Sequence, residues 1–176
     1  MTAEPEPLTL LPASEHPELL APVVAAALPQ DATVQVAAID PAAADTETFC
    51  ARYGIAPEES ANCVVVAARR GGETTYAACM VLATTRADVN GVVRRHLDAR
   101  KASFAPLDDV VALTGMEYGG ITPIGLPAGW PVLVDARAAA APRVVVGSGV
   151  RGSKLWLPGA ALAALPGGEV IEGLAR

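Results

Sequence analysis

A predicted β-hairpin near the middle of the chain constrains the fold more than any other feature. Asn62 to Ala68 is a short, almost fully apolar run, which is typical of a central buried strand. Arg70-Gly-Gly-Glu73 has the composition of a hairpin turn, and Thr75 to Ala83 fits the return strand. The chain is therefore expected to build its core on a sheet.

Length and composition limit the class of protein. The 176 residues match one domain, and 52% are hydrophobic but only 4% aromatic, so the core must consist mostly of Val, Ala and Leu. No apolar run reaches the roughly 18 residues that span a bilayer. The acidic stretch Met1–Pro7 lacks the basic region of a signal peptide. These features predict a cytoplasmic protein.

Helix and strand patterns mix without regular alternation, which argues against a doubly wound parallel sheet. Residues 1–14 are expected to be an extended acidic segment, and residues 15–176 a single domain. Besides the hairpin, the patterns predict helices at 17–28, 45–53, 89–97, 106–114 and 159–165, and strands at 32–39, 101–104, 131–134, 143–146, 154–157 and 169–171.

Charge divides the chain unevenly. Residues 1–60 hold ten Asp or Glu and one Arg, a net −9, whereas residues 61–176 hold nine acidic and twelve basic residues, a net +3, which together give the −6 of the chain. The basic cluster Arg94, Arg95, Arg100 and Lys101 suits a phosphate backbone, and a solvated helix face explains it as well. The whole chain lacks the charge of a high-affinity nucleic-acid binder.

Nucleophilic and metal chemistry have little support in the sequence. His16 and His96 are distant from each other and from any Ser or Cys motif. Cys50, Cys63 and Cys79 are widely spaced in apolar surroundings, which favours small buried residues over a disulfide or zinc framework. We therefore expect no metal and no cofactor.

A glycine- and proline-rich loop follows the predicted helix at 106–114. Gly115 fits a helix C-cap, and Gly119-Gly120 lets the backbone take positive φ or approach another group closely. Pro123 fixes φ and removes an amide hydrogen, and Gly125 closes the loop. One interpretation of these residues is an ordinary turn between a helix and a strand. If the loop has a function, it acts through backbone N–H and C=O groups.

Gly119-Gly-Ile-Thr-Pro123-Ile-Gly125 resembles the G-x-x-x-P loop of the YbaK and prolyl-tRNA synthetase-associated editing-domain family. The resemblance includes Asp88-Val-Asn, Lys101, Pro131-Val-Leu-Val-Asp135 and Val144-Val-Val-Gly-Ser-Gly149, and it covers residues 59–176. It implies an α/β fold of the α+β type, with a curved mixed β-sheet or barrel-like core and flanking helices in one compact domain. It also implies hydrolysis of wrongly charged aminoacyl-tRNA.

The resemblance implies a set of site residues. Asn62 stands at the family's lysine position, where it keeps a hydrogen-bond donor but not the charge. With Gly119 and Gly120 it forms the implied catalytic group. The implied substrate-binding residues are Ile121, Thr122, Pro123, Gly125, Asp135, Ser148, Gly149 and Lys101. Structural roles compete at four of these positions. They are a hydrogen bond to a strand-end backbone group for Asn62, a loop anchor for Asp135, a turn serine for Ser148 and a surface lysine for Lys101.

Two functions remain open at this point. The first is an enzyme, an aminoacyl-tRNA deacylase acting in trans on mischarged aminoacyl-tRNA, with a synthetase or translation factor as a further partner and a homodimer as one possible assembly. Such editing is needed because a synthetase pocket separates side chains that differ by one methylene by only about 1–3 kcal/mol. The alternative is a catalytically weak or inactive family member, which the neutral Asn62 favours, acting as a ligand-, tRNA- or protein-binding module.

Overall fold

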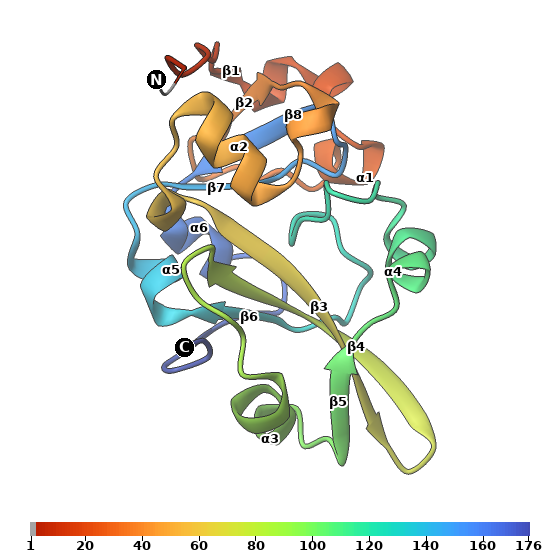
Figure 1. Cartoon of the computed structure of the whole chain (residues 1–176). Helices are drawn as coiled ribbons and strands as arrows, with labels where there is room; N and C mark the ends of the chain where they lie inside the picture. The colour runs from red at the N-terminus through yellow and green to blue at the C-terminus, as the bar shows by residue number, and fades with distance from the viewer. Residues whose placement is uncertain (1–2) are drawn as a thin grey trace.

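Two open β-sheets form the frame of the protein in a computed structural model that describes residues 3–176 (Figure 1). One sheet has the strand order β5-β3-β4-β6-β9 and the other β1-β2-β8-β7. The first sheet contains β3 (Ala61–Arg70), β4 (Glu73–Leu82), β5 (Lys101–Phe104), β6 (Val132–Asp135) and β9 (Gly168–Ile171). The second contains β1 (Leu11–Pro12), β2 (Gln35–Ala38), β7 (Val144–Gly147) and β8 (Ser153–Leu157).

The hairpin of β3 and β4 is the longest element of the five-stranded sheet. The two strands pair antiparallel from Ala61–Leu82 to Arg70–Glu73, as the apolar runs predicted. Gly71 and Gly72 both have positive φ, which allows a two-residue turn that matches the twist of the strands. β5 joins antiparallel to β3, whereas β6 and β9 add in parallel beyond β4, so this sheet is mixed.

The two sheets meet where β3 begins. Ser60, just before β3, forms an isolated parallel bridge with Val145 of β7. The strands of the second sheet pair antiparallel. One apolar cluster packs between the sheets and includes Val36, Met80, Val134 and Leu155, which are at most 1% exposed. The expected α+β fold with a mixed sheet is confirmed, and the sheets remain open instead of closing into a barrel.

Short helices cover the sheets. The α-helices are α1 (Pro22–Ala25), α2 (Thr46–Tyr53), α3 (Arg94–His96), α4 (Leu107–Thr114), α5 (Ala136–Ala140) and α6 (Gly159–Ala163). A π-helical turn at Val89–Val93 leads directly into α3. Short 3-10 turns lie at Ala13–Glu15, Pro17–Leu19, Pro41–Ala43 and Pro57–Glu59. In α2, Asp45 Oδ1 accepts a hydrogen bond from Thr48 N at 2.9 Å, and Gly54 ends the helix with φ of 67°.

Two helical segments differ from the sequence-based expectation. The continuous helix predicted at 17–28 is wrong, because Pro22 has no amide hydrogen and starts a new helix after the turn at Pro17–Leu19. The helix α5 was not predicted. It begins directly after β6, where the Asp135 carboxylate caps it by accepting from Arg137 N at 3.0 Å.

The acidic N-terminal segment packs on the second sheet. Residues 1–2 of the predicted extended segment lie outside the described residues. Farther along, Glu6 N donates to Arg52 O of α2 at 2.9 Å, and Leu8 and Leu10 pack against the cluster of buried aromatic and aliphatic side chains around Phe49. This segment therefore belongs to the packed structure from Glu6 onward.

Helix α1 lies directly against the glycine loop and the β7–β8 turn. Ala21 and Val24 are buried, at 1% and 0% exposure. A Cβ atom at Gly149 would overlap Ala21 Cβ, and one at Gly125 would overlap the carbonyl oxygen of Val23. Gly125 and Gly149 also have positive φ, 84° and 86°. The packing of α1 therefore requires glycine at both positions.

A matched pair of alanine variants separates the two reasons for glycine at position 149, which are its positive φ and the close approach of α1. Gly129 has φ of 84° but open space around a built Cβ, so Gly129→Ala should cost only backbone strain, about 1–2 kcal/mol of unfolding free energy. Gly149→Ala adds the collision with Ala21 and should cost about 1–3 kcal/mol more. Urea unfolding of both variants measures the difference. Equal losses would contradict the packing of α1 described here.

Candidate functional site

A cavity of about 410 Å³ opens where β3, β7 and the glycine loop converge. This volume falls within the range of small-ligand sites. Its wall combines the start of α2, the start of β3, the glycine loop, the end of β7 and one residue each from α4 and β8. The lining residues are Ala44, Asp45, Thr46, Ser60, Ala61, Asn62, Cys63, Val64, Leu107, Tyr118, Gly119, Ile121, Val145, Val146, Gly147 and Lys154. We call this space the Asn62 cavity.

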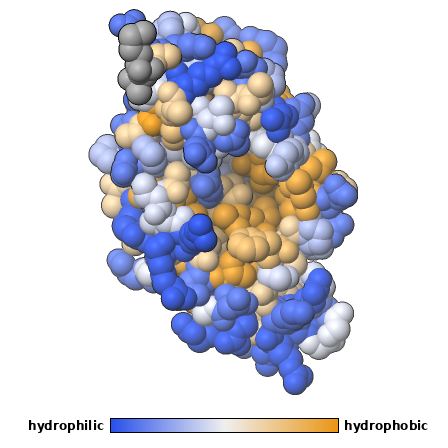
Figure 2. All heavy atoms as spheres, in the orientation of Figure 1, coloured by the Kyte–Doolittle hydropathy of each residue, from blue (hydrophilic) through white to orange (hydrophobic). Residues whose placement is uncertain are grey.

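Apolar side chains surround the mouth of this region. Figure 2 shows apolar surface gathered in a hollow in the middle of the molecule, over β3 and β4 and beside α4. Leu107 of α4 and Tyr118 of the glycine loop remain 44% and 61% exposed. A ligand that enters would therefore pass apolar and aromatic surface before it reaches the polar groups.

Asn62 is held in a fixed orientation. It is the second residue of β3, and its Oδ1 accepts a hydrogen bond from Thr46 Oγ1 at 2.7 Å. The side chain is half-buried. Because the oxygen is engaged by Thr46, the amide nitrogen is the group left to donate a hydrogen bond to a ligand.

The glycine loop packs backbone against backbone on β7 and the turn after it. Gly149 N donates to Gly120 O at 2.7 Å. A Cβ at Gly120 would lie 2.7 Å from backbone atoms of Val150, and one at Gly147 would lie 2.6 Å from the carbonyl oxygens of Gly120 and Ile121. Gly119 alone of the pair has positive φ, 82°. The two neighbouring glycines thus serve different needs, a turn at Gly119 and close approach at Gly120.

Arg151 fixes the loop from outside. Its Nη1 donates to Tyr118 O at 3.1 Å and its Nη2 to Pro41 O at 3.0 Å, while its backbone N donates to Glu117 Oε2 at 2.8 Å. The guanidinium also lies 5.5 Å from the centre of the Tyr118 ring. These contacts join the loop to the segment before α2, across the edge of the cavity.

Comparison with known proteins places this fold in a family. The sequence model of the aminoacyl-tRNA editing domain matches residues 40–165. The chain belongs to the aminoacyl-tRNA editing domain family. The match contains the cavity and its loop, and it confirms the resemblance inferred from the sequence. No curated protein matches the sequence significantly.

Solved structures share the fold at low identity. A candidate trans-editing enzyme for prolyl-tRNA synthetase has a TM-score of 0.71 and 18% identity, covering 93% of this chain and 98% of its own. The hypothetical protein APE2540 has a TM-score of 0.72 and 19% identity, covering 82% and 92%. A scaffold protein for computationally designed epitope grafting has a TM-score of 0.71 and 19% identity, covering 92% and 96%.

The structure brings together only part of the residue set that the family resemblance implied. Asn62, Gly119 and Ile121 line the Asn62 cavity. Gly120 packs directly behind Gly119. Thr122 is fully buried and its Oγ1 has no hydrogen-bond partner among the described residues.

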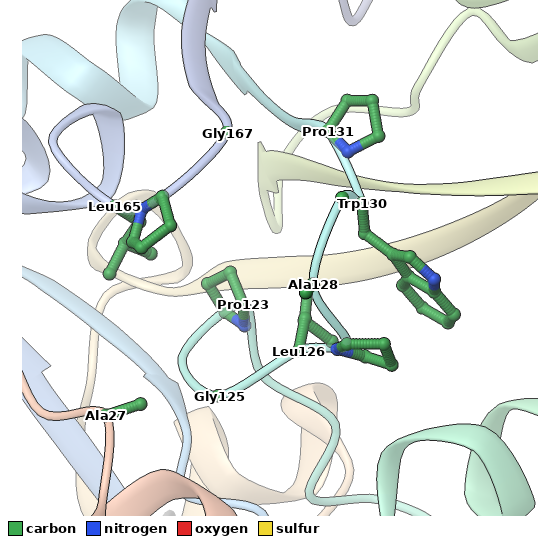
Figure 3. Close-up of a pocket in the computed structure, with 12 residues that line it drawn as sticks. Ala27, Pro123, Gly125, Leu126, Ala128, Trp130, Pro131, Leu165 and Gly167 are labelled. Atoms are coloured by element: carbon green, nitrogen blue, oxygen red, sulfur yellow. The ribbon is translucent and has the colours of Figure 1, made fainter.

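Later residues of the glycine loop line a second cavity. Pro123 and Gly125 line it, together with Leu126, Ala128, Trp130 and Leu165 (Figure 3). Its volume is also about 410 Å³. Its walls are Ala, Pro, Gly, Leu and Trp residues only, so they bring no ionisable side chain. The chemistry of a site is therefore better supported in the Asn62 cavity.

Three further residues of the set bond elsewhere in the protein. The Asp135 carboxylate is 1% exposed and accepts from Arg137 N, Arg137 Nε and Ala175 N, each at 3.0 Å. Ser148 is fully buried, and its hydroxyl shares a network with Ser153 Oγ at 2.7 Å and Ser153 O at 3.0 Å. Gly149 lies against α1. None of these three lines the Asn62 cavity in residues 3–176.

Lys101 lies at the far end of the hairpin. It is exposed on β5 and pairs with Arg69 of β3, seven residues along the strand from Asn62. At about 3.3 Å per residue this is about 23 Å from the cavity. Lys101 therefore lies outside reach of a ligand that Asn62 contacts.

The sequence analysis did not identify Lys154, which lines the Asn62 cavity from β8. The residue is 9% exposed, and its Nζ donates to Ala44 O at 2.8 Å and lies 5.5 Å from the centre of the Phe49 ring. Burial lowers the pKa of its ammonium below the ordinary lysine value. The signal available in the sequence was a lysine directly before the apolar run Leu155-Trp-Leu157 of a predicted strand.

Burial also disfavours the thiolate form of the cysteines, which makes them poor nucleophiles. Cys63 lines the cavity, but burial and the neighbouring Cys79 raise the pKa of its thiol well above the ordinary range. Burial raises the pKa of Cys79 to about 12, and it raises that of Cys50 as well. The nucleophilic thiolate is therefore scarce at neutral pH.

Metal and membrane features are not found in residues 3–176. Within this part of the chain, no three His, Cys, Asp or Glu side chains lie close enough together to hold a metal ion. None of its helices is long and apolar enough to span a membrane.

The raised thiol pKa values predict slow alkylation of the folded protein. At pH 8 Cys63 and Cys79 should react with iodoacetamide at least about tenfold more slowly than in the urea-unfolded chain, because one pKa unit changes the thiolate fraction tenfold. Cys50 should also react more slowly than in the unfolded chain, because its thiol pKa is raised. Intact-mass spectrometry follows the labels, and the unfolded chain, which should take three, is the control. One fast label at Cys63 in the native protein would show that a thiolate does form in the cavity wall.

Proposed function

We propose that this chain is an aminoacyl-tRNA deacylase that hydrolyses mischarged aminoacyl-tRNA in trans. The observation that carries the proposal is the convergence of Asn62 and the Gly119 loop on one cavity inside an aminoacyl-tRNA editing domain. A structure with the same fold is described as a candidate trans-editing enzyme for prolyl-tRNA synthetase, which supports action in trans. The partner is aminoacyl-tRNA, and the expected compartment is the cytoplasm.

The reaction needs water and positioned dipoles. Water adds to the ester carbonyl carbon, the bond from that carbon to the ribose oxygen breaks, and the ribose oxygen takes up a proton. The products are the free amino acid and uncharged tRNA. Backbone donors directed at the developing oxyanion can each contribute about 3 kcal/mol to such a transition state.

Two backbone donors are available in the wall of the cavity. Gly119 and Ile121 both line it, and their N–H groups donate to no protein acceptor within residues 3–176. The neighbouring Gly120 N is already engaged, donating to Glu117 O at 3.0 Å. We assign the oxyanion to the free N–H groups and the amide of Asn62. Among residues 3–176, the lining of the cavity contains no histidine and its one cysteine has a raised thiol pKa, which fits this water-based mechanism.

The other residues implied by the resemblance take supporting roles in this proposal. Thr122, Pro123, Gly125 and Gly149 set the shape of the loop, and Ser148 and Asp135 hold the ends of β7 and β6 in place. Lys101, on the far end of the hairpin, would contact the body of the tRNA and not its aminoacylated end. Arg69, its neighbour across the strands, would extend the same basic surface.

A binding module is the second candidate, and Asn62 is the observation that favours it. The amide brings no charge to the ligand, and it already accepts a hydrogen bond from Thr46. A chain of this kind would bind the aminoacylated end of tRNA or a related small ligand with little or no turnover.

Deacylation of a tRNA panel tests the enzyme directly. The wild-type protein should hydrolyse at least one of Ala-, Ser-, Cys- and Pro-mischarged tRNAs under single-turnover conditions. Asn62→Ala should slow that reaction by about 100-fold, the typical effect of losing one oxyanion donor. Asn90→Ala is the matched control, because the chain's other asparagine is exposed and its side chain makes no hydrogen bond within residues 3–176.

Each outcome separates the two candidates. If the wild type and Asn90→Ala are active and Asn62→Ala is slow, the deacylase is supported. If the wild type binds a charged tRNA but hydrolyses none of the four, the binding module replaces it. Equal rates for Asn62→Ala and wild type would remove Asn62 from the mechanism.

A further inference from the structure

The chain contains only two lysines, in opposite environments. Of its 13 basic residues, Lys101 and Lys154 are lysine and the others are arginine. Lys101 is exposed on β5, whereas Lys154 is more than nine-tenths buried on β8. The chain therefore places one of its two lysine side chains inside the protein, in the wall of the Asn62 cavity.

The Lys154 ammonium has few partners in the folded chain. Within residues 3–176 its Nζ makes one hydrogen bond, to Ala44 O, and no carboxylate lies within 4.0 Å. The charged or ionisable groups that act on it are Asp45, which caps α2, Cys50 of α2 and Arg151 of the turn between β7 and β8. The Asp45 carboxylate caps α2 through Thr48 N, and Arg151 adds positive charge.

Burying a cation without a carboxylate partner destabilises the folded state, because no ion pair compensates for the hydration that the cation loses. One structural role accounts for part of its presence, because the hydrogen bond to Ala44 holds the start of α2 on the sheet. A neutral donor would serve that role at lower cost. The residue also lines a cavity, and buried ionisable groups in cavities are frequently functional.

We propose that Lys154 is the cation of this site and that its ammonium binds an anionic oxygen of the substrate. The anionic oxygen is either a phosphate oxygen of the terminal nucleotide or the oxygen that develops at the ester carbonyl. This inference rests on the proposed deacylase function and assigns a residue to it. Lys154 and Asn62 reach the cavity from different sheets, β8 and β3, with the start of α2 beside both (Figure 1).

The pairing of Asn62 with Lys154 has an electrostatic reason. A lysine at position 62 would bring a second ammonium group into the same cavity, because both side chains lie beside the start of α2. Two ammonium groups in one small cavity repel each other and lower each other's pKa. A neutral side chain at position 62 is therefore expected where position 154 brings the charge, and the site keeps one cation in total.

An exchange of the two residues tests this assignment. Lys154→Met keeps the length and the apolar stem but removes the charge, and it should slow single-turnover deacylation by about 100-fold. Adding Asn62→Lys to Lys154→Met should restore the rate to within about tenfold of wild type, because a cation returns to the same cavity from β3. Arg143→Met, which removes an exposed charge, is the control.

Binding of stable substrate analogues distinguishes the two anionic oxygens. The probes are adenosine carrying the amino acid through a 3′-amide, with and without a 5′-phosphate, and calorimetry measures their affinities. The amino acid is that of the fastest tRNA in the panel, or alanine if no tRNA is hydrolysed. A phosphate contact predicts that Lys154→Met weakens only the phosphorylated probe. An oxyanion contact predicts unchanged binding of both probes with a slower reaction.

Stability against pH provides a readout that is independent of activity. The folded-state pKa of Lys154 is lowered, so the unfolded chain binds more protons between that pKa and about 10.4, the ordinary lysine value. The unfolding free energy of wild type should therefore rise with pH in this interval relative to Lys154→Met. If the unfolding free energies of wild type and Lys154→Met change with pH in the same way, the Lys154 ammonium is solvated in the folded protein and the proposal is overturned.

The remaining outcomes decide between this inference and the deacylase itself. If wild type is active and Lys154→Met matches it in rate and in both affinities, the inference fails and the deacylase stands. If the loss of activity in Lys154→Met equals the fraction of protein that is unfolded, Lys154 acts as an anchor of α2. If Lys154→Met is folded but slow and Asn62→Lys does not restore its rate, the loss of activity comes from a changed shape of the cavity. Both results overturn the charge role. A wild type that neither hydrolyses nor binds any probe overturns both proposals together.

Discussion

The contact of the Gly119–Ile121 backbone with the glycines at the end of β7 determines the arrangement of the whole site. Carbonyl oxygens of the loop lie so close to Gly147 that a single methyl group there would overlap them. The hydrogen bond from Gly149 N to Gly120 O fixes the register of this contact. Because β7 also bridges to Ser60, the loop, the start of β3 and the end of β7 are held within one small volume.

Local patterns predicted most of the regular structure. The β3–β4 hairpin, α2 and the helix before Gly115 all follow from short-range signals of apolar runs, capping residues and turn glycines, although Asp45 is the N-cap of α2 and not its first residue. Pro22 interrupts a helical pattern that composition alone continues. The helix α5 does not follow from the sequence pattern, because Ala-Arg-Ala-Ala-Ala contains no bulky apolar residue that would mark a periodic face. Its cap, Asp135, is interpreted in the sequence as a loop anchor or a substrate residue.

The site could be predicted only in part, because its residues come from segments far apart in the chain. The motif identified the loop and Asn62, and both lie on the same cavity. It also suggested Ser148, whose hydroxyl instead bonds to Ser153 behind the wall, while the neighbouring Gly147 lines the cavity. The turn after β7 directs the Ser148 hydroxyl toward Ser153, and a sequence does not show this contact between the two ends of the turn. Lys154 comes from yet another strand and carries no motif.

The packing of α1 against Gly125 and Gly149 also has a consequence for how the domain can be recombined. The family model matches residues 40–165, so α1 lies outside the matched part of the chain, although it touches the loop on which the site is built. A chimera that joins residues 40–165 to the N-terminal segment of a relative must present a side chain as small as Ala21 at this contact. The N-terminal segment and the loop thus behave as one module and have to be exchanged together.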